Sequence, residues 1–91
     1  MYLEIVSPEA SLVSGNVESV TVPGVEGEFQ MLNGHAAIVS LLGKGKVKFK
    51  GSATIAESHA DNFTQENGSW VMQINSGTVE MKDNKVIVLV D

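Results

Sequence analysis

The part of the chain that most constrains its fold runs from Ser14 to Ala37, where strand and turn signals follow one another closely. Val17–Val22 alternates apolar and polar side chains, a pattern typical of a strand with one buried face. Gly27 allows backbone angles that other residues resist, and Glu28–Met31 has the pattern of a return strand. Asn33-Gly34 then marks a second turn. These signals predict a β-hairpin that is followed at once by another tight turn.

The rest of the chain predicts more short strands with turns between them. Asn67-Gly68 is a strong hairpin signal, and Asp83-Asn84 joins the last two strands. The last strand is apolar on both faces, so we expect it to be central and covered on each side. The expected strands outside the first hairpin are Leu3–Ser7, Ser11–Ser14, Ala36–Leu41, the segment around Val47 and Phe49, Ala53–Glu57, Phe63–Gln65, the segment from Trp70 to Ile74, Gly77–Lys82 and Lys85–Val90.

The composition supports an all-β fold. Thirteen Val, five Ile and four Thr make about a quarter of the 91 residues β-branched, and such side chains pack well on a pleated surface. No helical stripe or internal repeat is visible. We therefore expect one domain over residues 1–91, a flattened β-sandwich or barrel of about eight to ten short strands.

Charge and cysteine content exclude several classes of function. The net charge is −5 and arginine is absent, which argues against nucleic-acid binding because that requires cations to neutralise phosphates. The absence of cysteine excludes disulfides and thiolate chemistry. No stretch approaches the roughly 20 apolar residues of a membrane span, so we expect membrane contact only through partner subunits. The alternating lysines fit a solvated strand face, edge protection or an anionic surface; they are Lys44, Lys46, Lys48 and Lys50.

Few residues could carry catalysis. His35 and His59 are the only natural general bases in the chain, and neither has a metal-ligand spacing. Glu26 and Glu28 are close carboxylates, which could be a solvated turn, a charged contact with a partner or the site of a small hydrolase. A 91-residue sandwich has little material for a cleft between them. We therefore expect no enzyme activity, no metal and no cofactor.

Two separated motifs resemble one known family. The first is Gly-Val-Glu-Gly-Glu-Phe at residues 24–29, followed six residues after Glu28 by Gly34-His35-Ala36. The second begins at Ile74-Asn75-Ser76-Gly77 and runs to Val90. Together they resemble the amino-terminal domain of the epsilon subunit of F-type ATP synthases, and the resemblance covers most of the chain.

The resemblance implies a function and a set of contact residues. Such domains are β-sandwiches of the rotating central stalk that link the gamma subunit to the c-subunit ring and help couple proton flow to ATP synthesis, at the cytoplasmic face of a bacterial inner membrane. By position, Glu28 and its neighbour Glu26 belong to the turn that faces the ring. His35 and Ser7 match positions on the gamma side.

Departures from the family pattern leave alternatives open. Gln30, Asn33 and Ala37 stand where the family often has glycine and two prolines, and the polar segment 52–67 has no counterpart. Longer members continue into a helical hairpin that can block rotation; ending at Asp91, this chain is expected to lack that brake, although a domain cut from a longer protein would read the same. The alternative function is a small carrier of the biotinyl or lipoyl type, because Glu80-Met81-Lys82 resembles part of a carrier turn.

Overall fold

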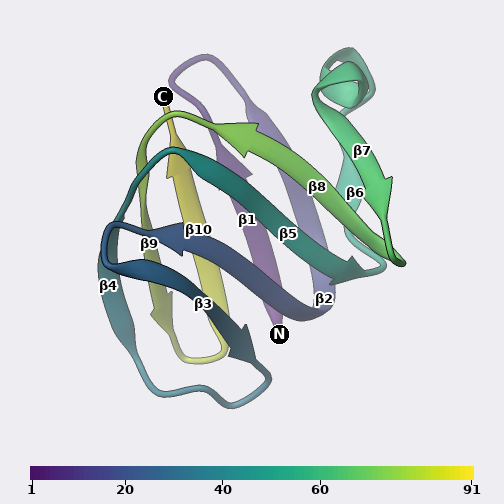
Figure 1. The fold of residues 1–91 in the computed structure, drawn as a ribbon. Coiled ribbons are helices and arrows are strands. Elements are labelled where there is room, and N and C mark those ends of the chain that lie inside the picture. Colours follow the sequence, from purple (N-terminus) through teal and green to yellow (C-terminus); the bar gives the residue numbers. More distant parts are fainter.

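The computed structural model describes all residues from 1 to 91 and contains ten strands and one short 3-10 helix (Figure 1). The all-β expectation is therefore confirmed. The elements are β1 Tyr2–Val6, β2 Ser11–Gly24, β3 Gly27–Leu32, β4 Ile38–Leu42, β5 Gly45–Gly51, β6 Thr54–Ile55, η1 Glu57–Asn62, β7 Phe63–Glu66, β8 Ser69–Ile74, β9 Gly77–Lys82 and β10 Lys85–Val90.

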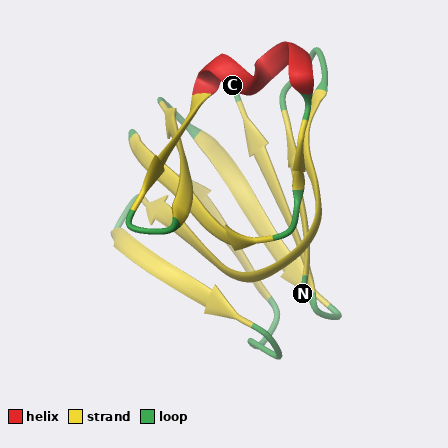
Figure 2. Ribbon diagram, turned by 90° about the vertical axis from the view of Figure 1, so that its right-hand side faces the viewer, coloured by secondary structure: helices red, strands yellow, loops and turns green.

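The strands form one continuous sheet in the order β1-β10-β9-β4-β2-β5-β8-β7, with β3 and β6 added on β2. The sheet folds over into two layers that face each other (Figures 1 and 2). We call β4, β9, β10, β1 and the start of β2 the first layer, and β3, the end of β2, β5, β8 and β7 the second layer. Strand β1 pairs in parallel with β10 and antiparallel with β2, while the β9–β10 pair is antiparallel.

Strand β2 corrects one sequence prediction. Ser11–Ser14 and Val17–Val22 were expected as separate strands, but they belong to one strand of 14 residues. Gly15, at φ 143°, continues the strand, and a Cβ there would lie 2.8 Å from the Cα of Ala53. The glycine therefore permits a close approach of two backbones rather than ending the strand. The first half of β2 pairs with β1 and β6, and the second half with β3 and β5.

The core lies between the two layers and is entirely apolar. The alternation of each strand turns every second side chain inward, and the buried residues form one cluster of 19. From the first layer these include Leu3 and Ile5 of β1, and from the second layer Val20 and Val22 of β2. No buried side-chain polar atom lacks a hydrogen-bond partner.

The polar segment 52–67 closes one end of the sandwich. It forms β6, the helix η1 and β7, and Figure 2 shows the helix lying across the strand ends. The short helix was not predicted. Phe63, the first residue of β7, is buried and packs edge-on against Phe49, with ring centroids 6.2 Å apart. This aromatic contact holds the segment on the core. No helix here has the length and apolar character to cross a membrane.

The hairpin turns predicted at Asn67-Gly68 and at Asp83-Asn84 are both confirmed. Asp83 and Asn84 have φ values of 52° and 61°, between the paired residues Lys82 and Lys85. Positive φ at both central positions defines a type I′ turn, which asparagine and aspartate tolerate better than most residues.

Candidate partner interface

Strand β10 is central but is covered on one face only. Val86, Val88 and Val90 point into the core, whereas Ile87 and Leu89 point outward, and Leu89 is 50% exposed. The sequence prediction that both faces would be covered is therefore wrong. The physical reason is that the sandwich has two layers, so the outer face of each layer meets no further element of the chain.

The outward residues of β10 continue into neighbouring strands. The register places Leu41, Thr78, Leu89 and Val6 side by side in one row across four strands. Val39 lies in the next row, where it is paired with Glu80. Val39 is 75% exposed and Leu41 is 63% exposed. We call this surface the apolar face and define it by Val6, Val25, Val39, Leu41, Ile87 and Leu89.

One end of the apolar face is hollowed beside the turn between β2 and β3. A shallow depression of about 440 Å³ is lined by residues that include Val25, Leu41 and Leu89. The backbone N–H of Val25 donates to the carbonyl oxygen of Leu41 over 3.2 Å. This bond fixes the turn against β4, so the acidic turn and the apolar face are parts of one surface.

The acidic turn follows from local sequence. Gly24 pairs with Gly27, which leaves Val25 and Glu26 as the two turn residues, and Gly27 has a φ of 133°. Glu26 and Glu28 are exposed and border the same surface hollow of about 330 Å³. The structure thus brings together the two carboxylates that the sequence singled out.

Glu28 has a partner that the sequence did not reveal. Its side chain lies on the outer face of the second layer, where the ammonium group of Lys48 is 3.8 Å from a carboxylate oxygen. A second lysine of the same strand, Lys46, pairs with Glu66 at 3.3 Å. Half of the lysine row therefore makes ion pairs within the chain, and the exposed Glu26 is the less engaged carboxylate of the turn.

His35 lies in the connection between β3 and β4, at the opposite end of β4 from the acidic turn. Its N–H donates to the carbonyl oxygen of Leu32 over 2.9 Å, and its Nδ1 is 2.7 Å from the carbonyl oxygen of Ala36. The side chain is exposed. His35 is therefore held by backbone contacts and is available to a partner.

Ser7 lies at the far end of β1 from this connection. Its N–H and the N–H of Ala10 donate to each other's carbonyl oxygens, and the hydroxyl group also donates to Ala10. β1 spans about 16 Å at 3.3 Å per residue, which separates Ser7 from the His35 end of the layer. Glu26 therefore lies at the β4 edge of the apolar face, Ser7 lies at its β1 edge, and His35 lies at one of its strand ends.

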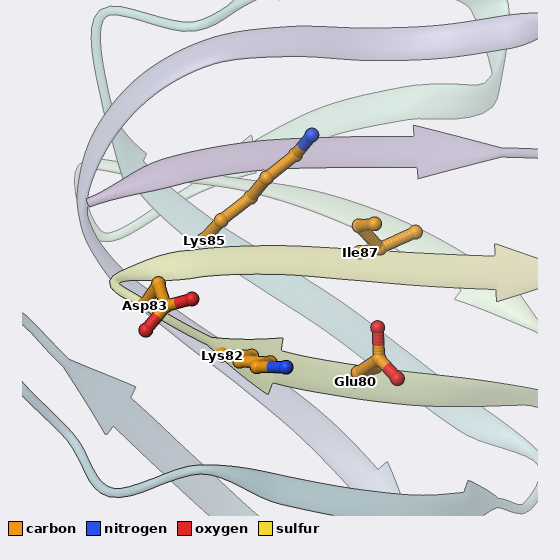
Figure 3. Close-up of a pocket in the computed structure, with 5 residues that line it drawn as sticks. All are labelled: Glu80, Lys82, Asp83, Lys85 and Ile87. Carbon is orange, nitrogen blue, oxygen red and sulfur yellow. The ribbon is translucent and has the colours of Figure 1, made fainter.

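Charged residues form the remaining border. Figure 3 shows Lys82, Asp83 and Lys85 around the β9–β10 turn, and Glu80 further along β9 next to Ile87. Glu80 is the one charged residue of this group that lies within the face, between Val39 and Ile87. Lys82, the residue of the carrier alternative, is the last residue of β9, and the turn itself is made by Asp83 and Asn84. An apolar centre with a charged rim is the usual composition of a protein–protein interface.

The sequence-predicted residues mark the edge of this surface, but its centre was missed. Val39 and Leu41 were predicted only as part of the strand Ala36–Leu41, and Leu89 was expected to be covered. The nearest signal in the sequence is the last strand, which carries more apolar side chains than one buried face requires, but this pattern does not say whether the second face is covered. Nowhere in the structure do three or more His, Asp or Glu side chains gather closely enough to hold a metal ion.

A small β-sandwich with one uncovered apolar face and a polar rim is typical of proteins that dock on another protein through a sheet. The family model described as "ATP synthase, Delta/Epsilon chain, beta-sandwich domain" matches residues 1–91. The chain belongs to this family. The resemblance inferred from the two motifs is thereby confirmed.

Individual relatives agree with this assignment. The ATP synthase epsilon chain of Campylobacter fetus is 40% identical over 91 residues, and that of Chlorobium limicola is 35% identical over 89 residues. The epsilon chain of Wolinella succinogenes is 49% identical over 63 residues, which are 69% of this chain. This chain spans 48% of the Wolinella protein, 60% of the Campylobacter protein and 86% of the Chlorobium protein. The family model and the Campylobacter relative both match across the polar segment 52–67, so the expectation that this segment has no family counterpart is wrong.

A solved structure shares the fold. A chain in the central stalk and c ring of the Tetrahymena thermophila mitochondrial ATP synthase aligns with a TM-score of 0.71 and 15% sequence identity. The alignment covers 98% of this chain and 61% of that chain.

Proposed function

We propose that this chain is a non-catalytic central-stalk subunit of an F-type ATP synthase, in which residues 1–91 act as one rigid domain. In this proposal it links the gamma subunit to the c-subunit ring and helps couple proton flow to ATP synthesis. It is peripheral, at the cytoplasmic face of a bacterial inner membrane, and reaches the membrane only through its partner subunits. Membership of the epsilon-chain family supports this type of complex.

The observation that carries the proposal is the apolar face. An exposed cluster of Val39, Leu41 and Leu89 contributes little to the fold, whereas its burial by a partner would contribute about 25 cal/mol for each Å² removed from water. Ser7 and His35, the residues that match the gamma side of the family, lie at the border of this face. We therefore assign the apolar face to the gamma subunit.

The acidic turn is assigned to the ring. Glu26 is exposed at the tip of a turn that is tied by backbone hydrogen bonds to β4. A two-residue hairpin with a paired glycine at each end has little freedom, so its carboxylates would meet polar loops at a defined position. The second carboxylate of this contact, Glu28, has the ammonium group of Lys48 at 3.8 Å.

The experiment compares two exposed leucines on opposite faces. Leu41→Asp places a charge on the apolar face, and Leu32→Asp places the same charge on the outer face of the second layer, where Leu32 is 51% exposed. We expect Leu41→Asp to weaken binding to purified gamma subunit about 100-fold, because burial of an unpaired carboxylate is costly. Leu32→Asp should change it less than about twofold.

The same variants should also be tagged and used as bait for affinity capture from solubilised host membranes. Wild type and Leu32→Asp are expected to bring down gamma, c subunits and the catalytic head, and Leu41→Asp to lose them. Equal recovery with all three proteins would remove the apolar face from the proposal. Failure of the wild type to bring down any of these subunits would overturn the proposed function itself.

A further inference from the structure

A group of hydrogen bonds joins three distant parts of the chain next to His35. Asn84, in the β9–β10 turn, donates from Nδ2 to Oδ1 of Asn33 over 2.7 Å, although the two residues are 51 positions apart. Its own Oδ1 accepts the N–H of Gly34 over 2.9 Å. The amino group of Met1 donates to Oδ1 of Asn33 over 3.2 Å. We call Met1, Asn33, Gly34 and Asn84 the asparagine clamp.

The orientation of the clamp is determined by its donors. The N–H of Gly34 can only donate, so it must face the oxygen of the Asn84 side chain, and the amide nitrogen of Asn84 is then free to donate to Asn33. Oδ1 of Asn33 accepts this bond together with one from the Met1 amino group. Each side-chain oxygen thus has a complementary partner.

The two sides of the clamp, the β9–β10 turn and the connection after Asn33, differ in how well they are anchored. Asn84 belongs to a type I′ turn with φ 61°, and its carbonyl oxygen accepts the N–H of Tyr2 over 3.0 Å, so its backbone is fixed. The connection from Asn33 to Ala37 lies between two strands and is exposed throughout. The β9–β10 turn is therefore the better anchored side of the clamp, and it holds the exposed connection through Asn84.

We propose that Asn84 is a positioning residue for His35. Gly34, at φ 81°, immediately precedes His35, and the clamp holds the amide of this glycine while the N–H of His35 bonds back to Leu32. The two bonds hold the N–H groups of two successive peptides, Asn33–Gly34 and Gly34–His35. His35 is then presented to its partner in one conformation, and ordering of the connection on binding is avoided. This inference rests on the proposed contact of His35 with the gamma subunit.

The test uses two glycine substitutions in one turn. Asn84→Gly removes the clamp but tolerates a positive φ, and Asp83→Gly makes the same backbone change at φ 52° without removing a clamp bond. We expect Asn84→Gly to raise the hydrogen-exchange rate of the Gly34 amide about tenfold and to weaken gamma binding about fivefold. Asp83→Gly should leave both within about twofold of the wild type.

A double-mutant cycle separates positioning from general loosening. In a His35→Ala background, Asn84→Gly should no longer weaken gamma binding, because the side chain that it positions is gone. If Asn84→Gly weakens binding equally in both backgrounds, or leaves Gly34 exchange unchanged, the positioning role is overturned. If the wild type itself does not bind gamma, the proposed function fails instead.

Discussion

The two layers of the sandwich have similar inner faces and contrasting outer faces. Inside, both present Val, Leu, Ile, Met or Phe to one shared core. Outside, the first layer exposes Val39, Leu41 and Leu89, whereas the second layer exposes polar groups such as Gln30 and the ion pair of Lys46 with Glu66. The inner faces are alike because the fold requires apolar burial on both. The outer faces are free of that requirement, so their difference reports on what each layer meets outside the chain.

The largest expected effect comes from breaking the first layer itself. A Cβ on Gly77 would collide with the backbone carbonyl oxygen of Leu89, within the pair of strands that carries the apolar face. We expect Gly77→Ala to lower the free energy of unfolding by about 2 to 3 kcal/mol, because backbone must shift to admit the methyl group. Thermal unfolding should show a Tm lower by about 10 to 20 °C.

Gly43→Ala is the matched control for this substitution. The nearest atom to a Cβ there is a methyl carbon of Val25 at 3.9 Å, an ordinary contact. Its free energy of unfolding should stay within about 0.5 kcal/mol of the wild type. Similar Tm values for both variants would mean that Gly77 is not needed for close approach of β9 and β10.

Two valines of the first layer allow the core side and the outer side to be compared by their contributions to the free energy of unfolding. Val79 is 1% exposed on the core side and Val39 is 75% exposed on the apolar face. Val79→Ala should reduce the free energy of unfolding by about 2 kcal/mol through lost burial and a cavity, and Val39→Ala by less than about 0.5 kcal/mol. Urea unfolding of the two variants measures both values. A large loss with Val39→Ala would show that the apolar face stabilises the isolated fold, which would weaken its assignment to a partner.

The smallest effect is expected on the polar outer face. Lys48 and Glu28 are 3.8 Å apart with partly exposed side chains. A double-mutant cycle with Lys48→Ala and Glu28→Ala should give a coupling energy of about 0.3 kcal/mol, because solvent screens such pairs. The coupling should fall further between 50 mM and 1 M salt, as expected from a Debye length that shortens to about 3 Å. A coupling that exceeds 1 kcal/mol and resists salt would make this face a structural one.

Much of the fold could be predicted because its signals are local. The alternation of apolar and polar side chains predicts the strands. The pairs Asn67-Gly68 and Asp83-Asn84 predict turns, and these residues have positive φ values in the structure. The failures occurred where the outcome depends on distant residues. Ser11–Ser14 and Val17–Val22 were predicted as separate strands because the close approach of Ala53 to Gly15, far along the chain, is invisible in the sequence.

In the candidate site, too, the predictable residues have local sequence signals and the others depend on distant residues. Glu26 and His35 could be named because glycine turns surround them, and turn chemistry is local. The apolar face could not be named, because a strand that is apolar on both sides does not reveal whether a third layer covers it. The asparagine clamp was also out of reach, since Asn33 and Asn84 meet only after the sheet has formed.

The parallel pairing of β1 with β10 has a consequence for biosynthesis. Residues 2–6 pair with β2 soon after synthesis but gain their second neighbour only when residues 85–89, the last strand of this domain, have been made. Contacts of such long sequence separation form late and slow the folding of β proteins. Because Leu89 and Ile87 belong to that last strand, the surface that we assign to the gamma subunit is incomplete until β10 has been made. Assembly into a larger complex would therefore begin only after translation of this domain is complete.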